Sequence, residues 1–173
     1  DTINGITVSD DGILWLATDA GVSYLKPGEA SFKNINHFSH KQLPEGIVTA
    51  VAVDGGIAWI GTFDNGLYRY EIAGGNVTKV LYDPLRDGAL HSQAITSLLA
   101  LPKRGLIVGT YGGGLSVVDS DGQVVRTIRA LAGSQISDII YALLLDHDDG
   151  ILIGNEQGVA KLSSDLQTLA DTD

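Results

Sequence analysis

The chain has 173 residues, of which 44% are hydrophobic, and its formal net charge is −10; these values suit one packed domain and disfavour a disordered chain. Its 11 Lys and Arg residues are scattered along the sequence, which argues against nucleic acid as a partner. The chain contains no Cys for disulfide or thiol chemistry, and no apolar run approaches the roughly 18 residues that a membrane span needs.

The first recognisable element is the run Trp15–Thr18, and it returns three times along the chain. Its counterparts begin at Trp59, Ile107 and Leu152, so that successive starts lie 44, 48 and 45 residues apart. Soon after each run comes a glycine followed by an aliphatic residue, with nearly the same spacing: Gly21, Gly66, Gly114 and Gly158. Two landmarks that share one period identify an internal repeat.

Each repeat contains four strand-like runs separated by turn residues. The first run is largely apolar, as in 95–101 and 139–145, which indicates a strand that is covered on both faces. The second is the run that begins at Trp15 and its counterparts, and the third follows the landmark glycine. The fourth carries two apolar residues three positions apart: Phe32/Ile35, Val77/Val80, Val125/Ile128 and Leu166/Leu169.

Four short strands in each repeat predict an all-β fold, namely a β-propeller of four blades with four antiparallel strands in each blade. The expected blades are residues 1–38, 39–82, 83–130 and 131–173, which form a single segment over 1–173. A stacked β-solenoid is the alternative, although its coils are usually shorter and seldom carry three hairpin turns each. In a propeller, Trp15 and Trp59 are expected to lie in the core between blades and not on a sugar-binding platform.

The second repeat carries a more specific pattern. Residues 59–70 (WIGTFDNGLYRY) resemble the repeat of two-component regulator propellers, and residues 82–95 resemble the linker between blades in that family. The resemblance covers essentially the whole chain, and it is weaker where Ile107 and Leu152 replace Trp. It implies a periplasmic sensor region of a membrane-anchored bacterial protein, of the hybrid histidine kinase or diguanylate cyclase type.

The same resemblance implies that the four blades are a fragment of a larger, seven-bladed propeller. A sequence that opens at Asp1 and contains no Met is expected to have been cut from a longer one. An open set of four blades would expose the apolar flanks of its first and last blades. Self-association through these open edges is one way to cover them, and the sequence leaves closure, openness and pairing as alternatives.

Two groups of residues suggest metal ligation, and both have simpler explanations. The acidic runs 119–122 and 146–150 resemble pieces of calcium loops, but both lie where the repeat requires a hairpin. His37, His40 and His91 could offer imidazoles to zinc, but their spacing fits loosely and no Cys joins them. We therefore assign no metal and no other cofactor. We also assign no catalytic residue, because no nucleophile elbow, phosphate loop or triad motif occurs.

The long connections between blades are the better candidates for binding. The first-to-second and third-to-fourth turns are short and emerge on one face of a propeller. The linkers 36–46, 81–94 and 129–138 emerge on the opposite face, together with the second-to-third turns that contain Phe63, Asp64 and Tyr111, and binding is expected to reside on this face. Its aromatic and hydrogen-bonding side chains suit a carbohydrate or another small polar ligand. The candidate ligand-binding residues are Phe63, Asp64, Tyr82, Arg86, His91 and Tyr111, and shielding of the channel mouth is the alternative role of the aromatic ones.

The sequence thus predicts a non-catalytic, ligand-sensing or partner-binding module of a bacterial signalling protein. The location that the resemblance implies is the periplasm. A structural or dimerisation module is one alternative. A lyase of the streptogramin-lyase type is another, because its blades have a similar pattern, but it would need a His-plus-acid constellation that does not recur among these repeats.

Overall fold

The computed structural model describes residues 2–130, 135–167, 169 and 170, and it contains four antiparallel sheets of four strands each. The first sheet consists of β1 (Ile3–Val8), β2 (Leu14–Thr18), β3 (Gly21–Leu25) and β4 (Lys33–Ile35). The second consists of β5 (Val48–Asp54), β6 (Ile57–Thr62), β7 (Leu67–Glu71) and β8 (Val77–Lys79). The third consists of β9 (Ile95–Leu101), β10 (Gly105–Thr110), β11 (Leu115–Val118) and β12 (Val124–Ile128). The fourth consists of β13 (Ile140–Leu145), β14 (Ile151–Asn155), β15 (Gly158–Leu162) and β16 (Leu169–Ala170).

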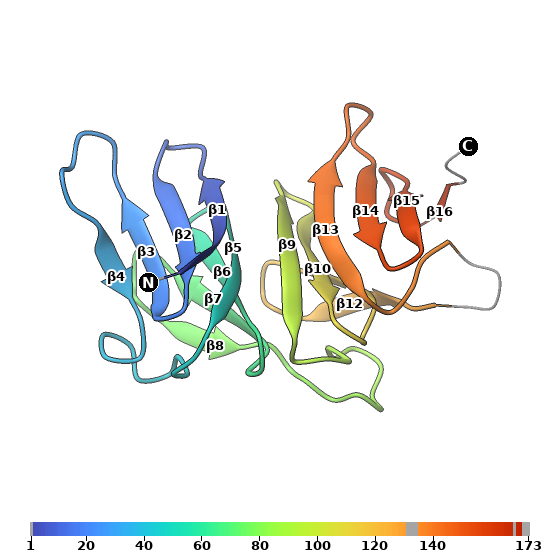
Figure 1. Ribbon diagram of the computed structural model, residues 1–173, viewed down its shortest axis with the longest axis horizontal. Coiled ribbons are helices and arrows are strands. Elements are labelled where there is room, and N and C mark those ends of the chain that lie inside the picture. The colour runs from blue at the N-terminus through green and yellow to red at the C-terminus, as the bar shows by residue number, and fades with distance from the viewer. Residues whose placement is uncertain (1, 131–134, 168, 171–173) are drawn as a thin grey trace.

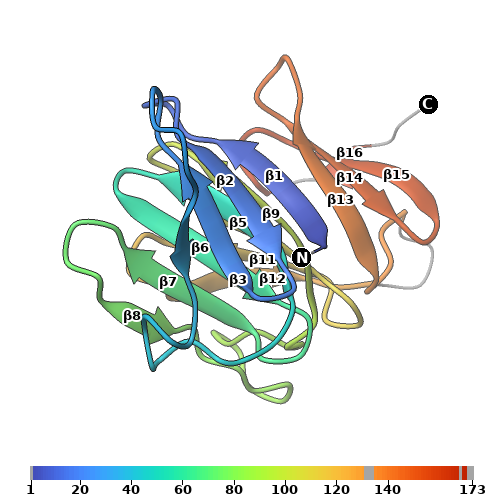
Figure 2. The ribbon, with the colours of Figure 1, turned by 60° about the vertical axis from the view of Figure 1, so that its left-hand side comes forward.

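The sheets are the blades of a four-bladed propeller, and the strands of each blade lie in chain order (Figure 1). Successive blades pack through their first strands, because β1 lies against β5, β5 against β9 and β9 against β13. Figure 2 shows the same four sheets after a turn of 60° about the vertical axis. No helix occurs among the described residues, and the predicted all-β propeller fold is confirmed.

The core of the molecule lies between the blades. One cluster of buried side chains joins the first two blades, another joins the middle two and a third joins the last two. Trp15 is 1% exposed and stacks on Tyr24 at a ring-centroid distance of 5.1 Å, while its indole N–H donates to the Ser9 hydroxyl. Trp59 is 3% exposed and belongs to the cluster that contains Leu106 of the third blade. The prediction that both tryptophans belong to the core is confirmed.

A side chain from each of the first three inner strands ties its blade to the next one. The second residue of each of these strands has no partner across the sheet, because the register shifts there by a β-bulge. The freed side chain reaches the neighbouring blade. Asn4 donates to the Val48 carbonyl at 3.0 Å, and Thr49 donates to the Ile95 carbonyl at 2.6 Å. Thr96 donates to the carbonyl of Ile140 at 2.5 Å. We call this repeated bond the inner-strand clasp.

The landmark glycines mark the point where the chain turns from the second strand to the third. Their φ values are 120° at Gly21, 82° at Gly66, 74° at Gly114 and 121° at Gly158. Backbone in this region strains any residue with a Cβ atom. At Gly114 a Cβ atom would also lie only 2.4 Å from the Ile128 carbonyl oxygen. Backbone conformation therefore favours glycine at all four positions, and lack of space also requires it at Gly21 and Gly114.

The fourth strands follow the predicted apolar pairs only in part. In the first three blades the second member of each pair is buried, namely Ile35, Val80 and Ile128. The first members Phe32 and Val125 are 45% and 60% exposed, because these strands form the outer rim of their blades. In the last blade Leu166 lies in the turn before β16 and is buried there.

The hairpins and the linkers emerge on opposite faces, as predicted. In Figure 1 the β1–β2 and β13–β14 hairpins lie at the upper edge, and the linker 81–94 lies at the lower edge. Positions 131–134 of the third linker lie outside the described residues. Nowhere in the described part of the chain is there a helix of the length and apolarity that crossing a membrane requires.

Candidate functional site

The turns between second and third strands carry exposed aromatic side chains on the linker face. In blade 2 the Thr62 hydroxyl donates to the Gly66 carbonyl at 2.8 Å and accepts an N–H from within the turn. Thr110 makes the same pair of bonds in blade 3. Phe63 and Tyr111 directly follow these threonines and are 60% and 57% exposed. These threonines bond the end of the second strand to the turn, and each turn presents its aromatic ring from a fixed frame.

The Tyr111 turn is also held by the two linkers that flank it. The Ser92 hydroxyl donates to the Tyr111 carbonyl at 2.8 Å. From the other side, the N–H groups of Gly112 and Gly114 donate to the Asp138 carbonyl at 2.8 and 3.0 Å. The linker before blade 3 thus holds the turn through the Ser92 side chain, and the linker after blade 3 holds it through the backbone of Asp138.

The linker 81–94 is itself anchored in the core. Ala89 and Leu90 are both 0% exposed. The Leu90 N–H donates to the Leu81 carbonyl at 2.9 Å, and the Asp83 N–H donates to the Leu90 carbonyl at 3.0 Å. Because the linker folds back on itself in this way, its exposed residues are held in place without a ligand.

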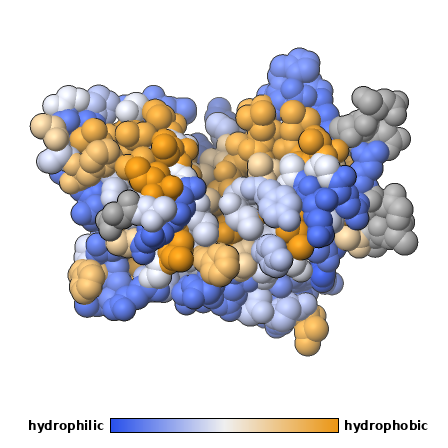
Figure 3. Space-filling model, in the orientation of Figure 1, coloured by the Kyte–Doolittle hydropathy of each residue, from blue (hydrophilic) through white to orange (hydrophobic). Residues whose placement is uncertain are grey.

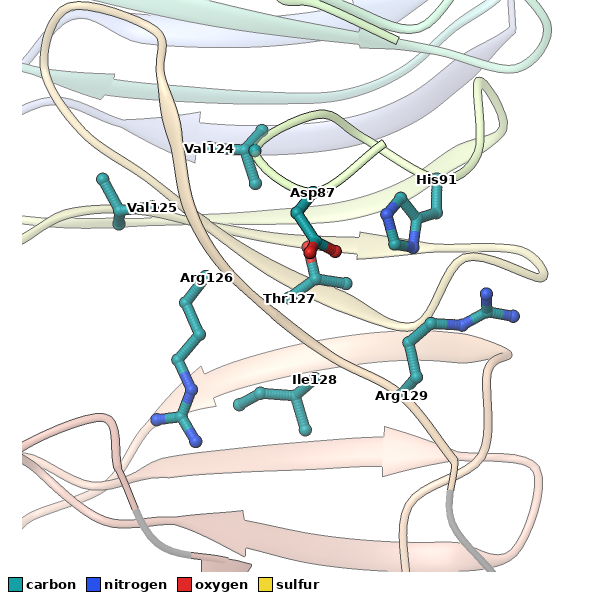
Figure 4. Close-up of a pocket in the computed structure, with 9 residues that line it drawn as sticks. Asp87, His91, Val124, Val125, Arg126, Thr127, Ile128 and Arg129 are labelled. Atoms are coloured by element: carbon teal, nitrogen blue, oxygen red, sulfur yellow. The ribbon is translucent and has the colours of Figure 1, made fainter. Parts of the chain in front are cut away.

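A pocket of about 570 Å³ lies between this linker and the outer strand of blade 3. Figure 4 shows Asp87 and His91 on the linker side, and Thr127 and Arg129 on the side of β12 and the residue after it. The full lining consists of Asp87, Gly88, His91, Val124, Val125, Arg126, Thr127, Ile128 and Arg129. A concave surface with a few polar groups over an apolar floor is the usual form of a small-molecule site.

His91 contributes a hydrogen-bonding atom that has no partner. Its Nε2 lies 3.3 Å from the Arg86 carbonyl oxygen, which can only accept a hydrogen bond, so Nε2 carries the proton. In a neutral imidazole the other nitrogen, Nδ1, is then an acceptor. This Nδ1 is buried and has no hydrogen-bond partner among the described residues. A buried acceptor of this kind favours a ligand or a water that donates to it.

The two arginines of the pocket are both engaged elsewhere. Arg126 donates to the carbonyls of Leu166 and Gln167 in the last blade, so it braces blade 3 against blade 4. Arg129 Nη2 lies 2.6 Å from Asp138 Oδ2, and the side chains of the two arginines extend in opposite directions in Figure 4. Burial alone would raise the pKa of Asp138, but the hydrogen bonds from Arg129 and from the Ala130 N–H outweigh it and hold that pKa below its usual range. The pocket therefore offers no unpaired guanidinium to an anion.

Of the residues that the sequence indicated, His91 lies in the pocket and Arg86 lies beside it. Tyr111 is joined to the same linker through Ser92. Phe63 and Asp64 occupy the corresponding turn of blade 2, where the Phe63 N–H donates to the Ile47 carbonyl and Asp64 accepts from Asn65. Tyr82 is 37% exposed and forms a bridge with Leu90 at the other end of the linker. Of the six residues, only His91 lines the pocket, and Arg86 and Tyr111 are connected to the same linker.

Sequence reasoning missed Asp87 and the polar side chains of β12. Asp87 is next to Arg86 in the same linker, so the local pattern already carried a signal for it. Thr127 offered none, because only the fold of the linker shows that the outer strand of blade 3 forms the opposite wall of the pocket.

The residues weighed as metal ligands have other partners. Lys161 Nζ lies 2.6 Å from Asp146 Oδ2 and 2.7 Å from Asp148 Oδ2, so an ammonium group neutralises the acidic hairpin. Asp119 Oδ1 accepts two backbone N–H groups of its own turn. Within the described ranges, no three His, Asp or Glu side chains lie close enough to hold a metal ion.

Replacing Arg129 with glutamine is expected to raise the pKa of Asp138 towards its ordinary value. Since the folded pKa is lowered, the contribution of the pair to stability is present above the ordinary carboxyl pKa and is lost as the pH falls through the lowered value. Wild type and variant should therefore differ in stability at pH 7 and converge in strong acid. NMR titration of the Asp138 carboxyl checks the pKa, Arg86→Gln serves as the control, and an unchanged Asp138 pKa would contradict the assignment.

Comparison with known proteins shows the fold. No protein-family model matches the sequence, and no curated protein matches it. The extracellular domain of the putative hybrid two component system BT3049 from B. thetaiotaomicron superposes with a TM-score of 0.77 and 20% identity, over 99% of this chain and 24% of that chain. The corresponding domain of BT4673 from the same organism gives a TM-score of 0.74 and 20% identity, over 99% of this chain and 22% of that chain.

The computationally designed Ika4 protein superposes with a TM-score of 0.64 and 20% identity, over 93% of this chain and 90% of that chain. The present chain thus spans less than a quarter of the length of the two Bacteroides chains. Those two structures are extracellular domains of two-component proteins, the class that the sequence resembles.

Proposed function

We propose that this chain is a non-catalytic sensor module whose linker face binds a small polar ligand, most simply a carbohydrate. The observation that supports this most directly is the pocket between the linker 81–94 and β12, whose lining includes His91, a residue with a buried Nδ1 that lacks a hydrogen-bond partner among the described residues. The extracellular location of the similar two-component domains supports a periplasmic or extracellular position in a membrane-anchored signalling protein. Signal output would then belong to other parts of such a protein.

The chemistry of the pocket favours a neutral, hydroxyl-rich ligand over an anion. Its arginines are already paired, so a carboxylate or phosphate gains no free guanidinium. His91 Nδ1 and Asp87 accept hydrogen bonds, and the Thr127 hydroxyl both donates and accepts. Sugar hydroxyls donate and accept in the same way. Tyr111, which is exposed beside the linker, offers an aromatic face to the apolar side of a sugar ring.

The rigidity of this region supports binding without a large conformational change. The linker is fixed by Ala89 and Leu90, and the Tyr111 turn is fixed by Ser92 and Asp138. Side chains that are already ordered lose little entropy when a ligand arrives, so several weak hydrogen bonds can add up to useful affinity.

The proposal is tested by titrating the 15N-labelled chain with neutral, amino-sugar and uronic-acid oligosaccharides. We expect a neutral oligosaccharide to shift the amide signals of residues 86–91, 111–114 and 124–129. Two variants of one residue then probe the acceptor. In His91→Asn a side-chain amide takes roughly the place of Nδ1, whereas His91→Gln keeps a donor for the Arg86 carbonyl and removes the acceptor. Affinity should fall about tenfold, or 1.4 kcal/mol, more in His91→Gln than in His91→Asn.

His147→Gln is the matched control, because His147 lies in the β13–β14 hairpin on the other face and its side chain is 88% exposed. It should leave the affinity unchanged. Shifts confined to the hairpins around Gly28, Gly74 and Asp121, or no binding by any member of the panel, would reject the proposed site.

A further inference from the structure

The first blade exposes a face that the second blade buries. Ile6 and Val8 of β1 are 67% and 63% exposed. Val51 is the counterpart of Ile6 in the second blade, because Ile6 pairs with Leu16 and Val51 pairs with Ile60 at the equivalent position of the second strand. Val51 is only 6% exposed. There the preceding blade covers it. We call this side of a blade, which faces the preceding blade, the back face.

The last blade exposes the opposite side, which we call the forward face. Val159 of β15 is 56% exposed and Leu144 of β13 is 62% exposed. The counterparts of Val159 are Leu67 and Leu115, because each of the three pairs with the glycine at the same position of its second strand (Gly154, Gly61 and Gly109). Both of these leucines are 0% exposed, because the following blade covers them.

The inner-strand clasp has the same open end. Its donor positions in the first three blades are Asn4, Thr49 and Thr96, and the corresponding position in the last blade is Tyr141. Tyr141 is 55% exposed. The acceptor that matches Val48, Ile95 and Ile140 is the carbonyl of Ile3 in the first blade. The forward face of blade 4 and the back face of blade 1 are therefore the two halves of the interface that the chain already forms three times.

The exposure of their side chains shows that the forward face of blade 4 and the back face of blade 1 do not pack on each other within one chain. Figure 3 shows apolar surface over β1 and β2 and again over β13, with a hollow between the two patches. We propose that two copies of this chain associate head to tail, the forward face of blade 4 of each copy covering the back face of blade 1 of the other. In this closed arrangement the two contacts are related by a twofold rotation, and neither apolar face is left open.

Continuity with the internal interface selects this occupant. On the forward face of blade 4, Leu144, Leu152 and Val159 take the positions that Ala52, Trp59 and Leu67 have in blade 2. On the back face of blade 1, Ile6 and Leu14 take the positions that Leu98 and Leu106 have in blade 3. A blade of the same build is thus the surface that fits each of them. A second copy of the chain supplies both faces at once, in the right order.

Sedimentation or light scattering of the 173-residue chain tests the proposal. We expect twice the chain mass of 18.2 kDa at micromolar concentration. Ile6→Lys should make the chain monomeric by disrupting every back face, and Val159→Asp should do the same through every forward face. Both positions are more than half exposed, so the fold of each variant is expected to persist, which its circular dichroism checks.

Mixing the two variants distinguishes the head-to-tail arrangement from any symmetric pairing of like faces. In the mixed pair one interface carries no substitution. The second interface joins the back face that carries Ile6→Lys to the forward face that carries Val159→Asp, so a positive side chain faces a negative one. Assemblies of two copies should therefore form again in the mixture. Leu85→Asp is the control, because Leu85 is 96% exposed in a linker and away from both faces, and it should still assemble. A monomeric wild-type chain, assemblies that persist in both single variants, or a mixture that stays monomeric would overturn the proposal.

Discussion

Replacing Trp59 with alanine is expected to lower the free energy of unfolding by about 3–5 kcal/mol, the usual cost of emptying a packed aromatic site. Trp59 is 3% exposed on the forward face of blade 2. Its cluster contains Leu67 of the same blade, and Leu106 and Val108 of the next. The substitution therefore opens a cavity between blades 2 and 3, which the Thr49 clasp also joins.

Denaturant unfolding followed by fluorescence and circular dichroism measures this loss. Phe63→Ala is the matched control, because Phe63 lies four residues further along and its side chain is 60% exposed. It should change stability by no more than about 0.5 kcal/mol. A Trp59→Ala chain that is as stable as wild type but fails to bind an oligosaccharide would place Trp59 in a ligand site instead of the core.

Gly114→Ala is expected to cost about 2–5 kcal/mol through two separate effects. The residue has a φ of 74°, and placing a Cβ atom in this region of the backbone costs roughly 1–2 kcal/mol. The new methyl group would also lie 2.4 Å from the Ile128 carbonyl oxygen, and this crowding adds typically about 1–3 kcal/mol. Since the Gly114 N–H and carbonyl both take part in the Tyr111 turn, the linker face should be disturbed as well.

Gly28→Ala separates the two effects. Gly28 has a φ of 79°, but a Cβ atom there would meet nothing within 4 Å. It should therefore show the conformational cost alone, and the difference between the two variants in thermal or denaturant unfolding measures the crowding. Equal losses in the two variants would show that the contact with Ile128 is relieved by movement of β12.

The sequence predicted the fold because the information is local and repeated. Trp15, Trp59 and the landmark glycines recur with one period, and each of them has the same structural cause in every blade where it occurs. The outer strands were predicted less well. Phe32 and Val125 are apolar but exposed, since an outer strand packs on its blade from one side only, and periodicity does not show which members of an apolar pair meet a neighbour.

The candidate site was predicted only in part for a similar reason. His91 and Arg86 could be identified because they lie in a long linker, and long linkers are readable from the spacing of the repeats. Thr127 could not, because its place in the pocket depends on how the linker folds back through the burial of Leu90. Tyr82 is not part of the pocket lining, although its bridge to Leu90 places it beside the residue that precedes His91.

The neighbour-only packing of the blades has a consequence for how such a chain can change over evolutionary time. Among the described residues, each blade contacts only its neighbours in the chain, through one kind of interface that occurs three times. Duplicating or deleting a whole period therefore joins a forward face to a back face as before, and every surviving contact is preserved. An insertion of one residue within a strand reverses the alternation of the side chains that follow it and turns buried residues outward. We therefore expect gene rearrangements in phase with the repeat to be tolerated and those out of phase to unfold the blade that they alter.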